Sequence, residues 1–426
     1  MPRTAEVDAI IVGAGPAGAT TALLLARAGH EVVLLDRHRF PRAKPCGDCL
    51  SAGATHILER LGLLAAVQAA RPANLTGWRI VAPDGASFFA RFGTGATGPR
   101  TALSLARERF DALLVDAARA HGATLRAPFR VTGLVPSRTG RVLGVRGRAA
   151  GGEPAELHAR LVIGADGLRS IVARRLRLLR RAPRLRKFSL TTHIRGPAPH
   201  HGHGEMHLAP GACLGIAPVT APASDDPGRV DLNVTLVADA DRFADDVARG
   251  ATRFFRTMLE RFPLRPLDGH AAALADESLH LMASGPFDWP TRDTIAHRAA
   301  LVGDAAGYYD PFTGQGIHHA LASAEILAEE ADAALRDDDL SANRLRRYAR
   351  RRAALLRGTR TLQRTIETVT ARPRLANFAI RRLADAPAAA EALIAATADL
   401  RRPASLLRPG PLLALLFARA IPTTAA

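Results

Sequence analysis

Gly13-Ala14-Gly15-Pro16-Ala17-Gly18 stands between a short apolar run, residues 7–12, and a helix-prone stretch, residues 19–28. A strand, a tight turn and a helix in this order form the setting in which a G-x-G-x-x-G sequence binds a dinucleotide. Gly13 makes the turn, Gly15 lets the backbone approach a pyrophosphate, and Gly18 lets the helix pack close to the strand. Pro16 and Ala17 lie inside the motif and count with it as predicted cofactor-binding residues.

A second strand, residues 31–35, ends at Asp36, about 20 residues beyond this motif. A carboxylate in this place commonly binds the hydroxyl groups of a ribose. Arg37 follows directly and is expected to cover the adenine or its phosphates.

Two later segments repeat the pattern of an apolar strand that ends at a glycine turn. The run 160–165 stops at Asp166-Gly167, and the run 300–302 stops at Gly303-Asp304. We expect Asp166 to bind the cofactor, and the carboxylate of Asp304 to accept hydrogen bonds from the ribityl chain of a flavin. NAD needs the first motif alone, whereas a flavin that is buried along its length needs the later segments too. The sequence therefore predicts FAD.

The third segment continues into a bend and a helix. Pro311, Gly314 and Gly316 form the bend, and the helix runs from about Ile317 to Leu335. The positive end of this helix would stabilise an anionic reduced flavin at the bend.

These motifs together resemble the aromatic-hydroxylase (p-hydroxybenzoate hydroxylase-like) superfamily of FAD enzymes, over about residues 5–350. Gly307 replaces the histidine that hydroxylases usually have, and the loop Lys44-Pro45-Cys46-Gly47-Asp48 is similar to one that faces the flavin in the geranylgeranyl reductase branch. The segment 107–111 matches the family's Arg-x-x-Phe-Asp helix start, where the resemblance implies that Arg107 reaches the flavin pyrophosphate.

The resemblance implies an FAD-dependent oxidoreductase that reduces carbon–carbon double bonds of a hydrophobic isoprenoid- or polyketide-like substrate by hydride transfer from flavin N5. NAD(P)H is the expected reductant, although the sequence has no second dinucleotide fingerprint. Reductases of this branch often have an aromatic-rich Pro-x-x-Tyr-x-Trp-x-Phe-Pro sequence, and the corresponding stretch here, residues 213–218, retains a proline without the aromatic residues. This departure favours an alternative, an FAD-dependent monooxygenase that hydroxylates an aromatic or polyketide substrate, whereas Gly307 and Cys46 favour the reductase.

Two further alternatives have less support. Halogenases share this fold and need a lysine some distance beyond the loop after the second strand, but the chain has no lysine between Lys44 and Lys187. A non-enzymatic flavoprotein is disfavoured because the flavin motifs are intact.

Three residues are candidates for the chemical step. Cys46 is expected beside the flavin, and either Tyr308 or Tyr309 could donate a proton after hydride delivery. Cys46 could also pair with Cys49 or Cys213, which the sequence leaves open. The histidines at 200, 201, 203 and 207 have a spacing that matches no standard metal site, so we predict no metal.

The predicted fold class is α/β. A Rossmann-like FAD-binding domain is expected to be discontinuous, over 1–75, 101–175 and 291–335, with an inserted mixed β-sheet substrate domain over 76–100 and 176–290 and a C-terminal helical region over 336–426. Within the substrate domain we predict a hairpin over 77–91, a strand over 230–237 and one helix over about 244–261. A further helix, dense in arginine, is predicted over 343–364.

The composition limits the partners. Net charge +18 and a pI near 11.3 would ordinarily suggest nucleic acid or an anionic surface. Almost all of the basic residues are arginine and aromatic residues make up 5%, so we predict no nucleic-acid binding and a hydrophobic small-molecule substrate. Three cysteines and the absence of a signal peptide indicate the cytoplasm. The apolar, arginine-flanked stretch 406–419 suggests peripheral contact with the inner face of the membrane, or a helix packed on the protein.

Overall fold

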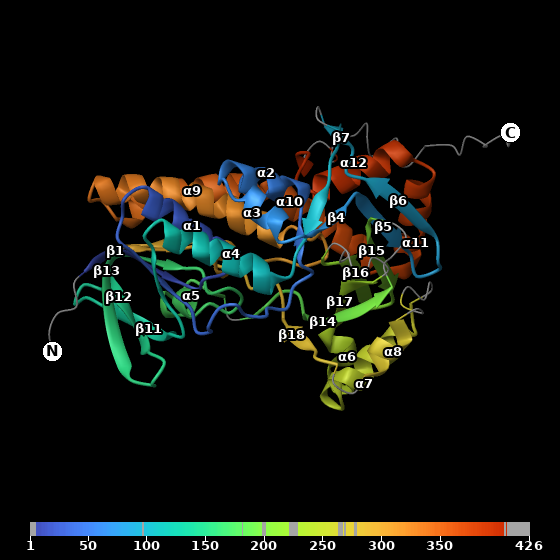
Figure 1. Cartoon of the computed structure of the whole chain (residues 1–426), viewed down its shortest axis with the longest axis horizontal. Coiled ribbons are helices and arrows are strands. Elements are labelled where there is room, and N and C mark those ends of the chain that lie inside the picture. The colour runs from blue at the N-terminus through green and yellow to red at the C-terminus, as the bar shows by residue number, and fades with distance from the viewer. Residues whose placement is uncertain are drawn as a thin grey trace.

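The computed structural model describes residues 6–95, 98–180, 182–197, 202–220, 229–262, 267, 270–276, 279–403 and 406. Its first layer is an eight-stranded sheet (Figure 1). The parallel part has the order β10-β2-β1-β13-β20, and the long strand β13 continues into an antiparallel extension of β12 and β11. The strands are β1 (Val7–Val12), β2 (Val32–Leu35), β10 (Thr124–Arg126), β11 (Arg130–Pro136), β12 (Val142–Arg148), β13 (Pro154–Gly164), β19 (Ile295–Ala296) and β20 (Ala299–Leu301).

Both faces of the parallel strands are buried, which explains why β1 and β2 are almost continuously apolar rather than alternating. One face packs on α1 (Pro16–Arg27), α4 (Arg107–Ala120) and α9 (Gly316–Arg336) through a core that includes Ile11, Leu23, Phe110 and Leu321. The other face packs on the β11–β12 extension and on α5 (Ile171–Arg175). This arrangement confirms the predicted α/β class with a Rossmann-like unit at its start.

A mixed seven-stranded sheet forms the second layer, with the order β18-β14-β17-β16-β15-β5-β6. Among the strands that the structure describes in this sheet, β15 and β5 pair in parallel and the other neighbours are antiparallel. The strands are β5 (Gly77–Val81), β6 (Ser87–Arg91), β14 (Lys187–Pro197), β15 (Gly204–Ala209), β16 (Ala212–Pro218), β17 (Arg229–Asp239) and β18 (Met282–Ser284). The predicted hairpin over 77–91 is thus present as β5 and β6, and it joins a sheet built mainly from strands a hundred residues later in the chain.

The two faces of the seven-stranded sheet differ in chemistry because side chains alternate along a strand. Val234 and Leu236 of β17 face a core that is closed by α6 (Ala240–Ala248) and α7 (Ala251–Leu259). Asn233 and Thr235 alternate with these two residues along β17, so they lie on the opposite face together with polar residues of β14. That second face is turned toward the cofactor motifs.

The single helix predicted over about 244–261 is wrong, because the structure has two helices there. Gly250 adopts φ 148° between α6 and α7 and caps the start of α7. A residue with a side chain rarely adopts this backbone conformation, so the glycine breaks the helix where the hydrophobic pattern alone continues. The other predicted helices are present, as α9 and α10 (Ala342–Thr370).

The remaining elements connect these layers. A small sheet is formed by β3 (Cys49–Leu50), β4 (Ala73–Leu75) and β9 (Ala102–Ser104), and β7 (Thr94–Gly95) pairs with β8 (Gly98–Pro99). The other helices are α2 (Ala52–Arg60), α3 (Leu64–Ala69), α8 (Ala271–Ala275), α11 (Pro373–Ala384), α12 (Pro387–Thr397) and a 3₁₀ turn at Gly303–Ala306.

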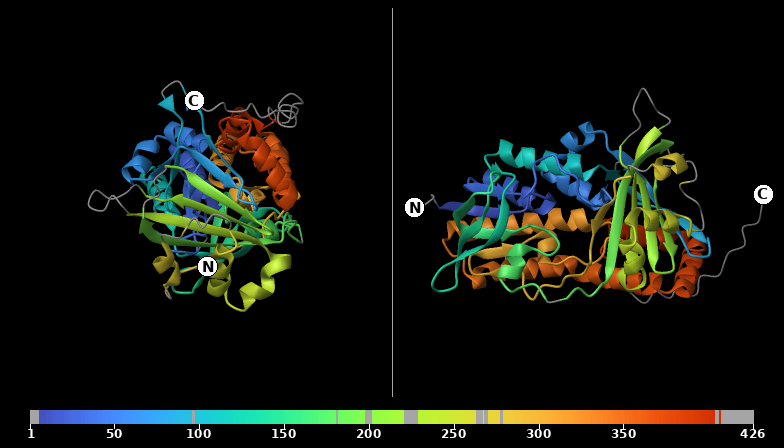
Figure 2. Two further views of the ribbon diagram at one scale, coloured as in Figure 1. Left: turned by 90° about the vertical axis from the view of Figure 1, so that its right-hand side faces the viewer. Right: turned by 90° about the horizontal axis from the view of Figure 1, so that it is seen from below.

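The C-terminal helices close the molecule at the second sheet. The helices α9 and α10 run along its long axis, and α11 and α12 lie beside β6 (Figure 1 and Figure 2). Asp399, just after α12, accepts hydrogen bonds from Ser51 Oγ at 2.8 Å and Gln315 Nε2 at 2.6 Å. The C-terminal region is therefore joined to the start of α9. Apart from residue 406, the predicted stretch 406–419 lies outside the described residues.

Within the part of the chain that the structure describes, no helix combines the length and apolarity needed to cross a membrane. The predicted domain boundaries stay a prediction.

Tyr348→Phe should destabilise the fold without changing its shape. The buried Tyr348 hydroxyl donates a 2.6 Å hydrogen bond to the carbonyl of Leu301, directly before the third glycine segment. Removal of the donor leaves a buried carbonyl unpaired, so we expect a loss of about 1–2 kcal/mol in the free energy of unfolding, measured in urea. Tyr309→Phe is the control, because the Tyr309 hydroxyl has no hydrogen-bond partner among the described residues. Equal stability of the two variants would contradict this role.

Candidate cofactor and active site

The turn after β1 leaves no room for side chains at two of its glycines. Gly13 has φ 103°, and a Cβ there would lie 2.4 Å from the Ala165 carbonyl oxygen. A Cβ on Gly18 would lie 1.8 Å from the carbonyl oxygen of Gly13. The helix α1 can therefore start against the strand only with glycine at both places, as the fingerprint requires.

Gly15 faces an open space with a positive lining. The position of an added Cβ there is 3.8 Å from Nη2 of Arg42 and 3.8 Å from Nη2 of Arg107. Two guanidinium groups over the start of a helix are the donors that a pyrophosphate needs. The lining thus fits the diphosphate of FAD, and Arg42 joins the predicted Arg107 as a residue that would hold it.

Buried carboxylates fix these two arginines. Arg107 donates to both oxygens of Asp111, at 2.7 and 2.8 Å, and Arg42 lies 3.3 Å from Asp111 and 3.4 Å from Asp36. Burial acts to lower the pKa of Arg107, but Asp111 and Cys46 outweigh burial, and the pKa of Arg107 is raised. The guanidinium of Arg107 is therefore held charged and oriented before any ligand binds.

Asp36 and Arg37 follow β2 as expected, with different surroundings. Asp36 is buried, and its two oxygens accept the amides of Ala14 at 3.0 Å and His38 at 2.9 Å. Arg37 is exposed and donates to the His38 ring. Asp36 thus braces the glycine turn, and a ribose-binding role for it stays a prediction.

In the second motif, the carboxylate of Asp166 is hydrogen-bonded by residues that closely follow it in the chain. Asp166 accepts hydrogen bonds from Ser170 Oγ at 2.5 Å and from the amide of Ile171 at 2.6 Å, which cap the start of α5. Ala165 meanwhile forms one wall of the first turn. The structure gives Asp166 a clear capping role, and contact with the cofactor stays a prediction.

Asp304 presents a carboxylate that the protein itself does not saturate. It accepts no hydrogen bond from the described residues, and burial raises its pKa although Lys44, Arg107 and Arg352 act to lower it. An acceptor without donors fits the ribityl hydroxyl groups predicted for this place. Arg107 acts on Asp304 and also lies beside Gly15, so the Asp304 carboxylate and the predicted pyrophosphate site share a positive neighbour.

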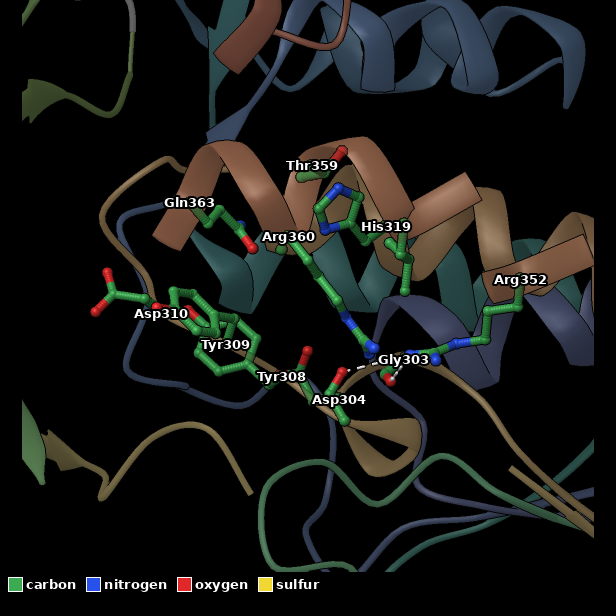
Figure 3. Close-up of a pocket in the computed structure, with 13 residues that line it drawn as sticks. Gly303, Asp304, Tyr308, Tyr309, Asp310, His319, Arg352, Thr359, Arg360 and Gln363 are labelled. Carbon is green, nitrogen blue, oxygen red and sulfur yellow. Dashed lines mark hydrogen bonds between the residues drawn. The ribbon is translucent and has the colours of Figure 1, made fainter. Parts of the chain in front are cut away.

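A small hollow lies between the third motif and the helices α9 and α10 (Figure 3). Arg352 of α10, which is buried, donates to the carbonyls of Gly303 at 3.4 Å and Gly307 at 3.3 Å. Arg360 extends from the next turns of α10 toward the same loop. The loop of the third motif is thus held by α10, a helix that lies beyond the motif in the chain.

The bend of the third motif is shaped by its glycines and by Asp399. Gly314 has φ 67°, Gln315 caps α9, and the side chain of Gln315 is held by Asp399. The predicted cofactor-binding residues Pro311, Gly314, Gly316 and Ile317 all lie in this bend or in the first turn of α9.

The structure separates the two candidate tyrosines. Burial, with Asp304, Asp310 and Cys46 nearby, raises the pKa of Tyr308 well above its usual value. Burial, followed by Glu367 of α10, raises the pKa of Tyr309 to about 12. Asp304 and Cys46 therefore act on Tyr308, whereas Glu367 of α10 acts on Tyr309.

All three cysteines are free thiols. Burial raises the pKa of Cys46, while Arg107 and the amide of Asp48 favour its thiolate. Burial also raises the pKa of Cys49 and of Cys213 to about 12 in each case. Cys213 is influenced by Lys187, Asp310 and Glu367 rather than by Cys46, so the structure gives no sign of a Cys46–Cys213 pair.

The histidine cluster does not assemble a metal site in the described residues. His200 and His201 lie outside them, and Nε2 of the buried His207 pairs with Glu205 at 2.7 Å. No group of three potential ligands occurs within the part of the chain that the structure describes.

Comparison with known proteins identifies the class. A family model described as "FAD binding domain" matches residues 6–207. The chain is an FAD-dependent oxidoreductase. It is 29% identical over 350 residues to digeranylgeranylglycerophospholipid reductase 1 of Methanothermobacter thermautotrophicus, covering 81% of this chain and 82% of that protein. It is 28% identical over 337 residues to menaquinone reductase of Mycolicibacterium smegmatis, covering 76% of each.

Among solved structures, the flavin-dependent halogenase CmlS is similar with a TM-score of 0.73 and 26% identity. The match covers 84% of this oxidoreductase and 64% of the halogenase chain, so just under two thirds of that chain is represented. The shared fold confirms the resemblance to the FAD superfamily.

Several site residues of this oxidoreductase could not be found by motif. Arg42 lies in an irregular loop, Arg352 comes from α10, and Asp399 lies in the turn just after α12, both beyond the last motif. His193 and Asn233 lie on strands where polar residues alternate with apolar ones, a pattern that also fits a solvated sheet face. The signal for all of them is tertiary contact.

Asp304→Ala should yield folded protein with little bound flavin. The substitution removes the unsaturated acceptor beside Lys44 and Arg107, while the surrounding backbone stays held by Arg352. The measurement is the ratio of released FAD to protein after purification. Asp116→Ala, at an exposed position of α4, is the matched control and should retain FAD. A full FAD complement in Asp304→Ala would refute the assignment of the third motif.

Proposed function

We propose that this oxidoreductase reduces carbon–carbon double bonds of a hydrophobic isoprenoid- or polyketide-like substrate. When bound and reduced, FAD supplies a hydride, which is two electrons and one hydrogen, and the second hydrogen must reach the substrate as a proton. The protein's part is to bind, orient and supply that proton.

The observation that carries the proposal is that Tyr308 is buried where the charges of both Asp304 and Cys46 act on it. Burial raises the pKa of both groups, so both hold their protons in the resting protein. Arg107 and the amide of Asp48 would stabilise a Cys46 thiolate after proton loss. A donor that is protonated at rest and stabilised after transfer suits general-acid work. The two reductase relatives support the same reaction class.

A monooxygenase is the alternative, and one feature favours it. The face of the seven-stranded sheet toward the cofactor motifs carries a polar chain, in which Thr191 and Thr235 share a 3.0 Å hydrogen bond and Thr235 donates to Asn233. Polar groups at this face would suit a phenolic or polyketide substrate better than a plain isoprenoid chain. A halogenase has less support, since Lys187 is engaged by Glu367 and by Asp310, at 3.5 Å from the latter.

NAD(P)H is the proposed reductant. Without a second fingerprint, recognition would depend on the phosphate charge. A hollow beside the ends of β14 and β17 is lined by charged residues of these strands, of α4 and of the segment after α3, namely Arg71, Arg109, Arg195, Arg229 and Asp231. This positive lining supports binding of a phosphate-bearing donor there.

Peripheral membrane contact also stays a proposal. Leu375 and Phe378 of α11 are exposed large apolar side chains, at 38% and 51%, and Arg374, Arg381 and Arg382 lie on the same helix. Apolar residues with flanking arginines suit the interface of an anionic membrane, where a hydrophobic substrate would be found.

The first test is the product mass from a mixed panel of polyprenyl and phenolic polyketide compounds. Chemically reduced holoenzyme is incubated with and without air. A reductase should add two hydrogens to a substrate in both cases, because neither the hydride nor the proton comes from oxygen. Gain of one oxygen atom, seen only in air, would overturn the reductase in favour of the monooxygenase.

Tyr308→Phe and Tyr309→Phe form a matched pair that tests the assignment of the proton. Loss of the Tyr308 hydroxyl should lower turnover about 10²-fold or more with FAD retained, since positioned proton donors typically contribute 10²–10⁴-fold. Tyr309→Phe should leave turnover near that of the unmodified enzyme, because Glu367 rather than Cys46 or Asp304 acts on Tyr309. The measurement is kcat with the substrate found above. Equal turnover of the two variants would remove Tyr308 from the chemical step.

A further inference from the structure

The loop that carries Cys46, residues 44–48, is attached to the seven-stranded sheet through Asp48. Asp48 is fully buried and has φ 55°, a conformation that aspartate and asparagine tolerate better than most residues. Its Oδ2 accepts hydrogen bonds from Nε2 of His193 at 2.5 Å and from Nδ2 of Asn233 at 2.7 Å. Its Oδ1 accepts the amide of Arg107 at 3.1 Å. One carboxylate thus joins the loop, the sheet and the start of α4.

The sheet presents its two donors in register. His193 of β14 and Asn233 of β17 are directly paired residues on neighbouring strands. Thr235 Oγ1 donates to Oδ1 of Asn233 at 2.8 Å, which turns the amide nitrogen toward the loop. That nitrogen also donates to the carbonyl oxygen of Cys46 at 2.7 Å. The same contacts therefore fix both Asp48 and the backbone of Cys46.

The charges around His193 favour its protonated form. Asp48 comes from the loop, Asp231 from β17 and Glu108 from α4, while Lys187 and Arg195 lie on its own strand. The hydrogen bond to Asp48 raises the pKa of His193 above 6.5, against the opposite effect of desolvation. The side chain is 36% exposed, so its proton can exchange with solvent while the Asp48 carboxylate is buried.

We propose that His193, Asp48 and Asn233 form a clasp that positions Cys46, and that the clasp is tight only while His193 is protonated. A charged imidazolium donor forms a stronger hydrogen bond to a buried carboxylate than a neutral ring does. Loss of the proton leaves Asp48 with a weaker partner and a buried negative charge that is less well compensated. The loop is then free to move, and the thiol of Cys46 with it. All three are positioning residues, since they act through Cys46.

The sign of the pH dependence follows from the raised pKa. The stabilisation by His193 is complete below the ordinary histidine value of 6.5 and is lost as the pH rises through the higher value in the folded protein. The clasp should therefore be closed in mildly acidic solution and open in alkaline solution.

Alkylation of Cys46 tests the clasp in the full-length holoenzyme without any substrate. The rate of labelling by iodoacetamide is measured by peptide mass at pH 6 and pH 9, with the buried Cys49 and Cys213 as internal references. His193→Gln retains a side-chain N–H donor but cannot titrate. At pH 6 it should label at Cys46 severalfold faster than the unmodified protein, and the ratio should approach one at pH 9, where the unmodified clasp has also opened.

Two further variants keep the test decisive. Asp48→Asn tolerates the same backbone conformation but removes the charge, and it should behave as His193→Gln does. His121→Gln, at the exposed far end of α4, should match the unmodified protein at both pH values. Equal labelling of His193→Gln and unmodified protein at pH 6, or a ratio that is the same at pH 6 and pH 9, would overturn the proposal.

An effect of the clasp on turnover rests on the proposed function. With an established substrate, kcat of the unmodified enzyme should fall as the pH rises over this range, whereas His193→Gln should be lower and flatter. If the labelling result holds and the kcat profiles coincide, the clasp stands and the role of Cys46 in the reaction fails. If labelling is unaffected, the clasp fails whatever the reaction is.

Discussion

The contact between helix α1 and the turn after β1 is the constraint on which the cofactor site depends. The Gly18 Cα approaches the Gly13 carbonyl so closely that no side chain fits, and Gly13 in turn lies against Ala165 at the end of β13. This packing directs the start of α1 toward the space beside Gly15 and brings the first and second glycine motifs into contact. The two arginines predicted to hold the cofactor, Arg42 and Arg107, lie beside that helix start.

Electrostatics completes what the packing begins. Burial of two guanidinium groups is costly unless carboxylates compensate for them, and Asp111 does so for both Arg42 and Arg107. The arginines consequently face the glycine turn with fixed geometry and retained charge. The Asp304 carboxylate, which accepts no hydrogen bond from the described part of the chain, is influenced by Lys44 and by Arg107. Some buried hydrogen-bonding groups here thus have no partner within the described residues and are available to a ligand. This is typical of a binding site and unusual for a core.

The reacting side of the site is assembled from segments that are far apart in the chain. Cys46 comes from a loop after β2, Tyr308 from the third motif, and Asp48 is held by strands β14 and β17 of the other sheet. The helix α10 and Asp399 hold the third motif from the C-terminal side. The geometry at Cys46 therefore depends on how the two layers and the C-terminal helices dock, as well as on the dinucleotide fold itself.

The sequence by itself determined the α/β class, the FAD motifs and the α9 helix, because these depend on local rules: glycine where no Cβ fits, apolar runs where both sheet faces are buried, and a helix after each turn. It also suggested Arg107 through the resemblance to a known FAD family, and Asp304 through its place at the third glycine turn. The tertiary structure decided the rest. Arg42, His193, Asn233 and Arg352 have no local pattern that distinguishes them from surface residues, since their partners lie up to 187 residues away. The break at Gly250 and the different surroundings of Tyr308 and Tyr309 likewise depend on backbone conformation and on tertiary packing, which neighbouring residues in the chain do not specify.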